Sequence, residues 1–330
     1  MPNMKSIDNK IVKNKSLAQF TNYKIGGPAR YFLAVKKDQD LVEAIKWAKE
    51  NKIEYFILGG GTNILISDDG YAGLVLKLEN KDFTIKDNVI KTGAGAILFD
   101  LVKASVAQGL TGFEWASGLP GTVGGAVRGN AGAFGGQMDQ IVTNAKAFDC
   151  QTLKFNEYNN KQLQFSYRHS RFKEEVNQEI VLSVEIKLKK GGDKKKSQMM
   201  IAEYLEKRGK LPILPSAGCI FKNVELKKGT FQLADPGQGE IKETVKKDIR
   251  RDHPEYLEWG KIPAAFLIEY VGLKGKQINN VQVSDKHANY LVNLGGGRAA
   301  DVIMLISLIK QKVRSEAGIQ LKEEVQLVGF

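Results

Sequence analysis

The chain carries the stretch Gly118-Leu-Pro-Gly-Thr-Val-Gly-Gly-Ala-Val-Arg-Gly-Asn-Ala-Gly-Ala-Phe-Gly-Gly136, in which eight of nineteen residues are glycine. Glycine serves where the backbone adopts a positive φ or approaches another group without a Cβ in the way, and no helix or strand needs so many. A second glycine turn, Gly59-Gly-Gly-Thr-Asn63, follows the apolar run Tyr55-Phe-Ile-Leu58. Consecutive N–H groups in such turns can bind anions. The two turns together predict an enzyme with a phosphate-bearing or flat cofactor.

Known nucleotide-binding fingerprints do not account for these turns. Gly93-Ala-Gly95 has Leu98 where the third glycine of Gly-x-Gly-x-x-Gly should stand, and no Gly-x4-Gly-Lys-Ser/Thr occurs. The diphosphate of a flavin dinucleotide suits the remaining pattern. Tight turns without a ligand explain either turn alone, but they explain the pair less well.

The bulk properties exclude several classes of function. The length of 330 residues allows two or three domains. The net charge of +12 comes from scattered lysines. This indicates a solvated surface or an attraction for phosphate-bearing ligands, without a nucleic-acid-binding signature. No apolar stretch approaches the ~20 residues of a membrane span, and the N-terminus lacks the apolar centre of a secretory signal. We therefore expect a cytoplasmic protein with no membrane or nucleic-acid partner.

A metal site is not expected either. The two cysteines, Cys150 and Cys219, lie far apart in the sequence. The three histidines, His169, His253 and His287, lack the spacing of zinc ligands.

Hydrophobic periodicity predicts a mixed set of elements. The expected strands are 31–35, 55–58, 74–78, 89–91, 141–148, 179–189, 288–294 and 325–328, and the expected helices are 40–51, 98–108, 199–208 and 301–317. Strands and helices alternate without a strict βαβ rhythm, so the fold class is predicted as α+β. Residues 1–20 read as a lead-in, the lysine-rich run 190–197 as the domain boundary, and the charged stretch 224–262 as an inserted surface excursion.

Seven segments occur in the order typical of one enzyme family, from about residue 20 to the C-terminus. They include Leu58-Gly-Gly-Gly-Thr-Asn63, Phe165-Ser-Tyr-Arg168, Ser216-Ala-Gly-Cys-Ile-Phe-Lys-Asn223 and Leu321-Lys-Glu-Glu-Val325. The others are 22–30, 118–127 with 130–133, and 283–289. In these motifs the chain resembles the UDP-N-acetylenolpyruvoylglucosamine reductase family, in the branch without an extra tyrosine-bearing loop.

The resemblance implies a fold and a reaction. It implies an FAD-binding fold of the vanillyl-alcohol-oxidase type over residues 21–190, with subdomains of about 21–78 and 79–190, followed by a substrate domain over 198–330. NADPH would reduce the flavin, and hydride from flavin N5 would reduce UDP-N-acetylenolpyruvoylglucosamine to UDP-N-acetylmuramate for peptidoglycan. A monomer is expected. The stretch 224–262 is longer than this branch leads us to expect, and we interpret it as a tolerated surface insertion.

Three residues receive catalytic roles from the resemblance. Arg168 matches a catalytic arginine, and its planar fork of donors suits a carboxylate or an enolate. Cys219 stands where the family usually has a proton-donating serine. A thiol, with an ordinary pKa of ~8.5, is a far stronger acid than a hydroxyl. A buried packing cysteine is the alternative interpretation. Glu324 matches the glutamate of the protonation step, with Glu323 as its one-residue alternative.

Binding roles follow in the same way. The residues expected to bind FAD are Gly59, Gly60, Gly61, Thr62, Asn63, Pro120, Gly121, Gly124, Gly125, Asn130 and Gly132. The residues expected to bind the sugar nucleotide or NADPH are Tyr167, Lys222, Asn223, Lys286 and His287, of which His287 fits a structural role equally well.

Two other functions stay open from the sequence. One is a flavin oxidase on the same fold, although no histidine or cysteine lies in the glycine runs to attach the flavin covalently. The other is a non-catalytic basic protein that binds nucleotides or RNA.

Overall fold

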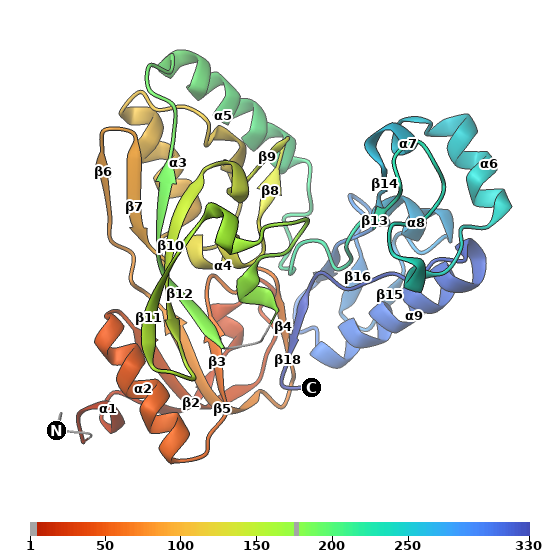
Figure 1. The fold of residues 1–330 in the computed structure, drawn as a ribbon. Coiled ribbons are helices and arrows are strands. Elements are labelled where there is room, and N and C mark those ends of the chain that lie inside the picture. Colours follow the sequence, from red (N-terminus) through yellow and green to blue (C-terminus); the bar gives the residue numbers. More distant parts are fainter. Residues whose placement is uncertain (1–4, 175–177) are drawn as a thin grey trace. The chain divides into compact units, whose positions relative to one another are not determined.

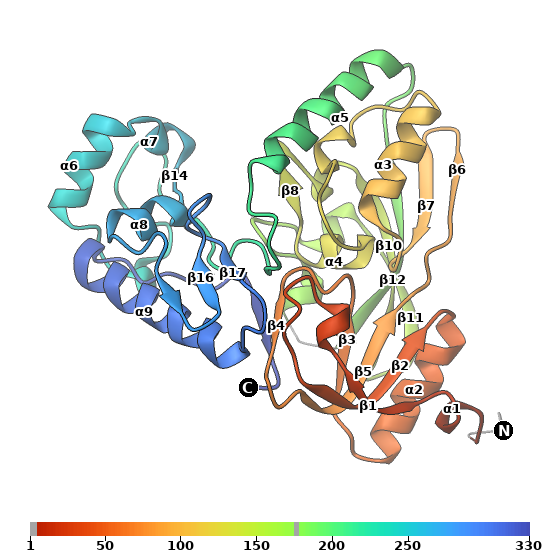
Figure 2. The same ribbon diagram turned by 180° about the vertical axis from the view of Figure 1, so that it is seen from behind.

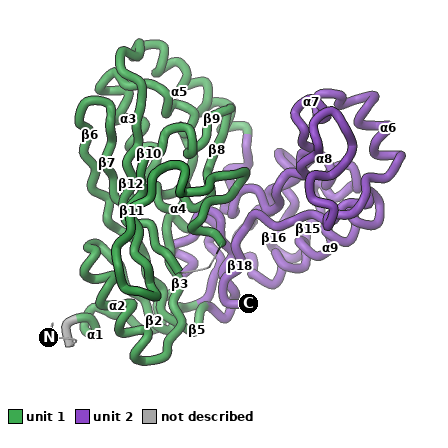
Figure 3. Tube along the Cα trace, in the orientation of Figure 1, with its two compact units in different colours: residues 1–16, 28–61, 71–210 green, residues 17–27, 62–70, 211–330 purple. Residues whose placement is uncertain are grey.

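The computed structural model describes residues 5–174 and 178–330, which form two compact units (Figure 3). Unit 1 comprises the chain up to Ser16 together with Pro28–Gly61 and Tyr71–Lys210, and unit 2 comprises Leu17–Gly27, Thr62–Gly70 and Leu211–Phe330. The main boundary therefore follows Lys210 rather than lying at 190–197. Two short segments, which the sequence assigned to the first domain or its lead-in, belong to unit 2.

The first sheet of unit 1 has the order β1-β2-β5-β3. Its strands are β1 (Val12–Ser16), β2 (Pro28–Val35), β5 (Tyr71–Leu78) and β3 (Tyr55–Leu58). β2 and β3 both run parallel to β5, and β1 pairs antiparallel with β2 at the edge. The lead-in is therefore corrected: residues 12–16 are an edge strand, preceded by α1 (Lys5–Asp8), while residues 1–4 lie outside the described part.

Helix α2 (Asp38–Glu50) packs on this sheet (Figure 1). It buries the predicted apolar stripe of Leu41, Ala44, Ile45 and Ala48. β3 is the strand that the apolar run predicts, and it ends directly before the first glycine turn. The first glycine turn therefore lies at the C-terminal end of a parallel strand.

The second sheet of unit 1 is antiparallel, in the order β11-β10-β12-β7-β6. Its strands are β6 (Phe83–Lys86), β7 (Val89–Gly93), β10 (Val142–Asp149), β11 (Lys154–Asn159) and β12 (Glu179–Lys187). Helices α3 (Leu98–Ala107) and α5 (Lys194–Gly209) contact each other, as Figure 2 shows from behind. Both sheets contribute to one apolar core.

Helix α5 begins inside the stretch predicted as a linker. Asp193 caps it, because its carboxylate accepts the N–H groups of Lys195 and Lys196. Ser197, one turn later, is buried and donates from Oγ to Glu114 Oε1 at 2.6 Å. This contact, 83 residues apart in the chain, anchors the helix to unit 1 and has no local sequence signal.

Unit 2 contains a three-stranded sheet of β15 (Gln277–Ile278), β16 (Val281–Val283) and β17 (Leu291–Asn293). Helix α9 (Ala299–Ala317) packs on β15, β16 and helix α8 (Ala264–Tyr270). The parallel pair of β4 (Ile64–Ile66) and β18 (Gln326–Val328) completes the unit. The stripe of α9 that periodicity predicted is buried.

The stretch 224–262 is part of the core of unit 2, which corrects its interpretation as a surface insertion. It forms β13 (Val224–Glu225), α6 (Glu243–Asp252), α7 (Glu255–Trp259) and β14 (Lys261–Ile262), and β13 pairs with β14. Its buried side chains include Val224, Ile241, Val245, Ile249 and Ile262. The stretch is rich in charged residues, so its average composition does not reveal these few buried apolar positions.

Candidate functional site

The two glycine turns meet within unit 1. A Cβ on Gly60 would lie 2.7 Å from the Cα of Gly121, and a Cβ on Gly59 would lie 3.0 Å from Thr122 Oγ1. Gly121 also has a φ of +122°, which a side chain would disfavour. The close approach of two backbones therefore requires glycine on both sides of this junction.

Several donors at the junction have no acceptor within the described part of the chain. Among the described residues, no carbonyl accepts the N–H of Gly59, Gly60 or Gly61. Thr122 Oγ1 is buried, with the residue 3% exposed, and finds no partner there either. Gly61 and Thr122 are buried, while Gly59 and Gly60 are partly buried. Because buried donors are normally satisfied, this arrangement calls for a ligand with acceptor oxygens. The diphosphate of FAD provides such oxygens, so the residues present fit this cofactor.

The rest of the long glycine run forms regular structure rather than a ligand-binding turn. Helix α4 (Val123–Arg128) lies inside it, and the β8–β9 hairpin (Gly132–Ala133, Gly136–Gln137) follows. A Cβ on Gly124 would meet Ala94 at 2.8 Å, and one on Gly132 would meet the carbonyl oxygen of Gly136 at 2.7 Å. Close packing explains these two glycines, whereas Pro120 and Gly125 remain exposed and accessible to a ligand.

Arg168 lies in a tight turn of unit 1 with a φ of +55°, a left-handed conformation that costs a residue other than glycine of order 1 kcal/mol. Ser166 and His169 close the turn through N–H···O bonds of 3.2 and 3.1 Å. Lys173 Nζ donates to the Arg168 carbonyl at 2.9 Å. Tyr167 packs beside the guanidinium, whose Cζ lies 5.7 Å from the ring centroid. The fold thus holds a strained backbone at a predicted catalytic residue.

Asn130 connects the glycine run to this turn. Its Nδ2 donates to the Ser166 carbonyl at 3.0 Å, and its Oδ1 accepts the N–H of Asp139 at 3.1 Å. Asn130 was expected to bind the cofactor, but its side chain is committed to these contacts. We infer that it positions the Arg168 turn.

Within unit 2, the backbones of Cys219 and Glu324 are neighbours. Cys219 pairs with Tyr290 in a single antiparallel bridge, and the N–H of Glu324 donates to the Ile220 carbonyl at 2.7 Å. Asn63 Nδ2 donates to the Glu324 carbonyl at 3.0 Å. Cys219 and Glu324 are both partly exposed, so the alternative of a buried packing cysteine does not describe Cys219.

One of the two neighbouring glutamates forms an ion pair with helix α9. Glu323 Oε1 accepts from Lys310 Nζ of α9 at 2.6 Å, with both side chains 30% exposed. Glu323 is thus engaged in an ion pair within unit 2, and the assignment of a chemical role to Glu324 rests on its place in the motif.

The other predicted substrate residues differ in their surroundings. Asn223 Oδ1 accepts the N–H of Ala264 at 3.1 Å and so caps α8. Lys222 is partly exposed and Lys286 is exposed. Burial lowers the pKa of His287, whose Nδ1 has no partner in the described chain and whose ring packs edge-on against Tyr290. The lowered pKa favours a neutral imidazole at His287.

Two residues at the junction escaped the sequence analysis. Thr122 is one, and Lys77 is the other, since Lys77 Nζ donates to the Gly59 carbonyl at 2.6 Å. The only available signal for Lys77 was a lysine inside the apolar run Leu74-Val-Leu-Lys-Leu78.

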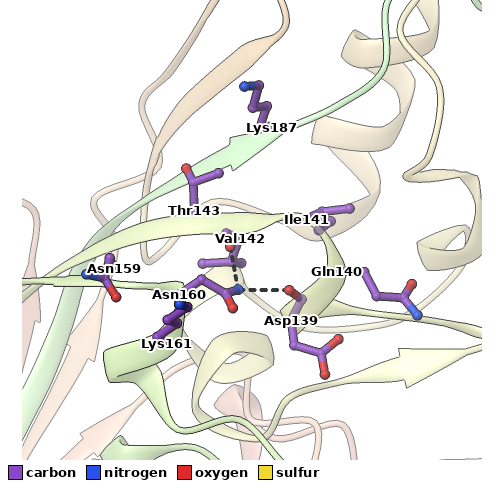
Figure 4. Close-up of a pocket in the computed structure, with 9 residues that line it drawn as sticks. All are labelled: Asp139, Gln140, Ile141, Val142, Thr143, Asn159, Asn160, Lys161 and Lys187. Atoms are coloured by element: carbon purple, nitrogen blue, oxygen red, sulfur yellow. Dashed lines mark hydrogen bonds between the residues drawn. The ribbon is translucent and has the colours of Figure 1, made fainter.

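A surface hollow elsewhere on unit 1 contains none of the predicted site residues (Figure 4). There Asn160 Nδ2 donates to the carbonyls of Asp139 and Val142. Over residues 5–174 and 178–330, no group of three or more His, Cys, Asp or Glu residues is arranged to hold a metal ion. No helix in that same part of the chain is long and apolar enough to cross a membrane.

Two family models and many curated proteins match the chain. Residues 29–152 match the FAD binding domain family, and residues 209–328 match the UDP-N-acetylenolpyruvoylglucosamine reductase C-terminal domain. The UDP-N-acetylenolpyruvoylglucosamine reductase of Solibacter usitatus is 34% identical over 315 residues, 95% of each chain. The corresponding enzyme of Prochlorococcus marinus is 35% identical and covers 96% of this chain and 92% of its own.

A solved structure extends the agreement to the fold. The crystal structure of the reductase from Thermus caldophilus matches with a TM-score of 0.72 at 29% identity, over 96% of this chain and 98% of that one. The prediction of an α+β fold is confirmed. The chain belongs to the UDP-N-acetylenolpyruvoylglucosamine reductase family.

Proposed function

We propose that the chain reduces the enolpyruvyl ether of UDP-N-acetylenolpyruvoylglucosamine to UDP-N-acetylmuramate, with FAD as cofactor and NADPH as reductant. The observation that carries the proposal is the junction of two glycine turns in a chain of this family, where the N–H donors of Gly59, Gly60 and Gly61 find no acceptor among residues 5–174 and 178–330. A monomer working in the cytoplasm is part of the proposal. Light scattering that gives a mass near 36.5 kDa would support the monomer, and twice that mass would contradict it.

The glycine turns would hold the cofactor. FAD, when bound, would supply two-electron hydride chemistry, with NADPH as the reductant and the enolpyruvyl double bond as the acceptor. The amides of Gly59, Gly60 and Gly61 and the hydroxyl of Thr122 would donate to its diphosphate. Fixed backbone donors bind anions well because they need little reorganisation.

The remaining residues would manage charge and proton. Addition of hydride to the enolpyruvyl carbon–carbon double bond leaves an electron pair on the carbon beside the carboxylate. The permanent cation of Arg168 would stabilise that charge. Cys219 would then donate its Sγ–H proton to this carbon, which completes addition across the double bond, and Glu324 would orient the protonation step.

Anaerobic absorbance spectroscopy tests this function. The purified chain should show flavin bands, lose them on addition of NADPH, and regain them on addition of the enolpyruvyl sugar nucleotide. A flavin oxidase would regain colour with oxygen but not with this substrate. A chain that shows no flavin bands and binds polyanions with strong salt dependence would instead be a non-catalytic basic protein.

A pair of glutamate variants tests the assignment of Glu324. Glu324→Gln is expected to lower kcat by about 100-fold, because the protonation step loses its carboxylate. Glu323→Gln is the matched control. It removes only the ion pair with Lys310, so kcat should change less than threefold and the free energy of unfolding by at most about 1 kcal/mol. Steady-state kinetics and thermal unfolding of both variants measure this, and the reverse pattern would assign the role to Glu323.

A further inference from the structure

Lys77 is a charged residue in an apolar place. It lies near the end of β5, the strand with β2 on one side and β3 on the other, and it pairs in register with Leu58. Its strand neighbours Leu74, Val75 and Leu76 are fully buried. The lysine side chain is itself partly buried and directs Nζ to the Gly59 carbonyl. A lysine at such a position requires a reason, because lysine is rarely buried without a partner.

The hydrogen bond to Gly59 controls the direction of the next amide. The described chain has no cis peptide bond, and in a trans peptide the C=O of one residue and the N–H of the next point to opposite sides. With the Gly59 carbonyl held toward Lys77, the N–H of Gly60 faces away from the lysine. That N–H is one of the donors without an acceptor among the described residues.

Charge adds to this geometric effect. Burial lowers the pKa of Lys77, while nearby Glu79 raises it in part. An ammonium group removed from water is less screened than one on the surface, so its field acts more strongly on an anion at the turn. A neutral side chain of similar length would retain the packing and lose this field.

We propose that Lys77 is the positioning residue of the first glycine turn, which orients the turn's amides toward the diphosphate of FAD. The inference rests on the proposed function, because it takes FAD as the occupant of the junction. It assigns Lys77 no contact with the reacting atoms.

Titration of the flavin-depleted full chain tests the inference. Flavin fluorescence would give dissociation constants for FAD and for riboflavin, which lacks the diphosphate. Lys77→Met is expected to weaken FAD by about 10- to 100-fold, the range for losing a charge-assisted hydrogen bond. Riboflavin affinity should change less than twofold. A purely structural role would weaken both ligands alike.

Two control variants accompany Lys77→Met. Lys91→Met removes the same charge from an exposed site on β7, where Lys91 pairs with Glu185, and should leave FAD affinity unchanged. Lys77→Gln keeps a donor and loses the charge. It should weaken FAD at least about fivefold and serves if Lys77→Met does not fold.

The outcomes separate the two proposals. Unchanged FAD affinity in the Lys77 variants, or equal weakening of FAD and riboflavin, would overturn the role of Lys77 alone. A wild-type chain that does not bind FAD would overturn the proposed function and this inference with it.

Discussion

Replacement of Cys219 by alanine is expected to leave flavin reduction by NADPH intact and to slow flavin reoxidation by the enolpyruvyl sugar nucleotide by about 100- to 10,000-fold. This is the range that a positioned proton donor contributes. The alanine variant lacks the Sγ–H proton, so the anion formed by hydride addition would collapse back. Stopped-flow absorbance, with the two half-reactions measured separately, shows which step has slowed.

Two further variants serve as comparisons for Cys219→Ala. Cys219→Ser keeps a hydroxyl proton on a side chain of similar size, so this variant should continue to turn over the substrate. Cys150→Ala is the matched control, because Cys150 is 1% exposed in the core of unit 1. It should lower the free energy of unfolding and leave both half-reactions unchanged. Normal reoxidation in Cys219→Ala would show that the proton comes from another group.

The second large effect is expected for Arg168→Met, which should lower kcat by about 100- to 1,000-fold while FAD stays bound. The variant loses the permanent charge that stabilises the developing anion, and losses of this size follow the removal of one such donor. Rapid-reaction kinetics should place the loss in the substrate half-reaction. Bound flavin, measured by absorbance after gel filtration, should match the wild type.

Arg171 provides the matched control three residues away. Its guanidinium pairs with Glu179 at 3.0 Å and stacks on Tyr158, with Cζ 3.7 Å from the ring centroid. Arg171→Met should therefore lower the midpoint of thermal unfolding and leave kcat within about threefold, since the contacts that it loses are structural. An equal loss of kcat in both variants would mean that the Arg168 effect is a general disturbance of this loop.

The elements with strong local signals were predictable. The stripe of α2 and the apolar run of β3 were found within two residues of their ends, because side-chain periodicity follows directly from helix and strand geometry. The same holds for α9 and for the start of β12. The glycine turns were also visible, since glycine is the residue that accepts a positive φ, as at Gly61 and Gly121, or a close backbone approach, as at Gly60.

Features that depend on distant partners were not predictable. The stretch 224–262 read as a surface insertion, because its mean composition is charged while its buried positions are few. The linker at 190–197 proved to include the start of α5, held by the Ser197–Glu114 hydrogen bond. The eight glycines of residues 118–136 proved to serve two purposes: some allow close packing, and others line the junction that would hold a ligand.

The amino-acid sequence by itself determined the element types, the two glycine turns and the family motifs, because each depends on residues close together in the chain. Only the tertiary structure decided that Asn130 holds the Arg168 turn, that Glu323 pairs with Lys310, and that Lys77 lies beneath Gly59. The physical reason is that a polar side chain takes its role from the partner that folding brings to it, and that partner lies far away in sequence.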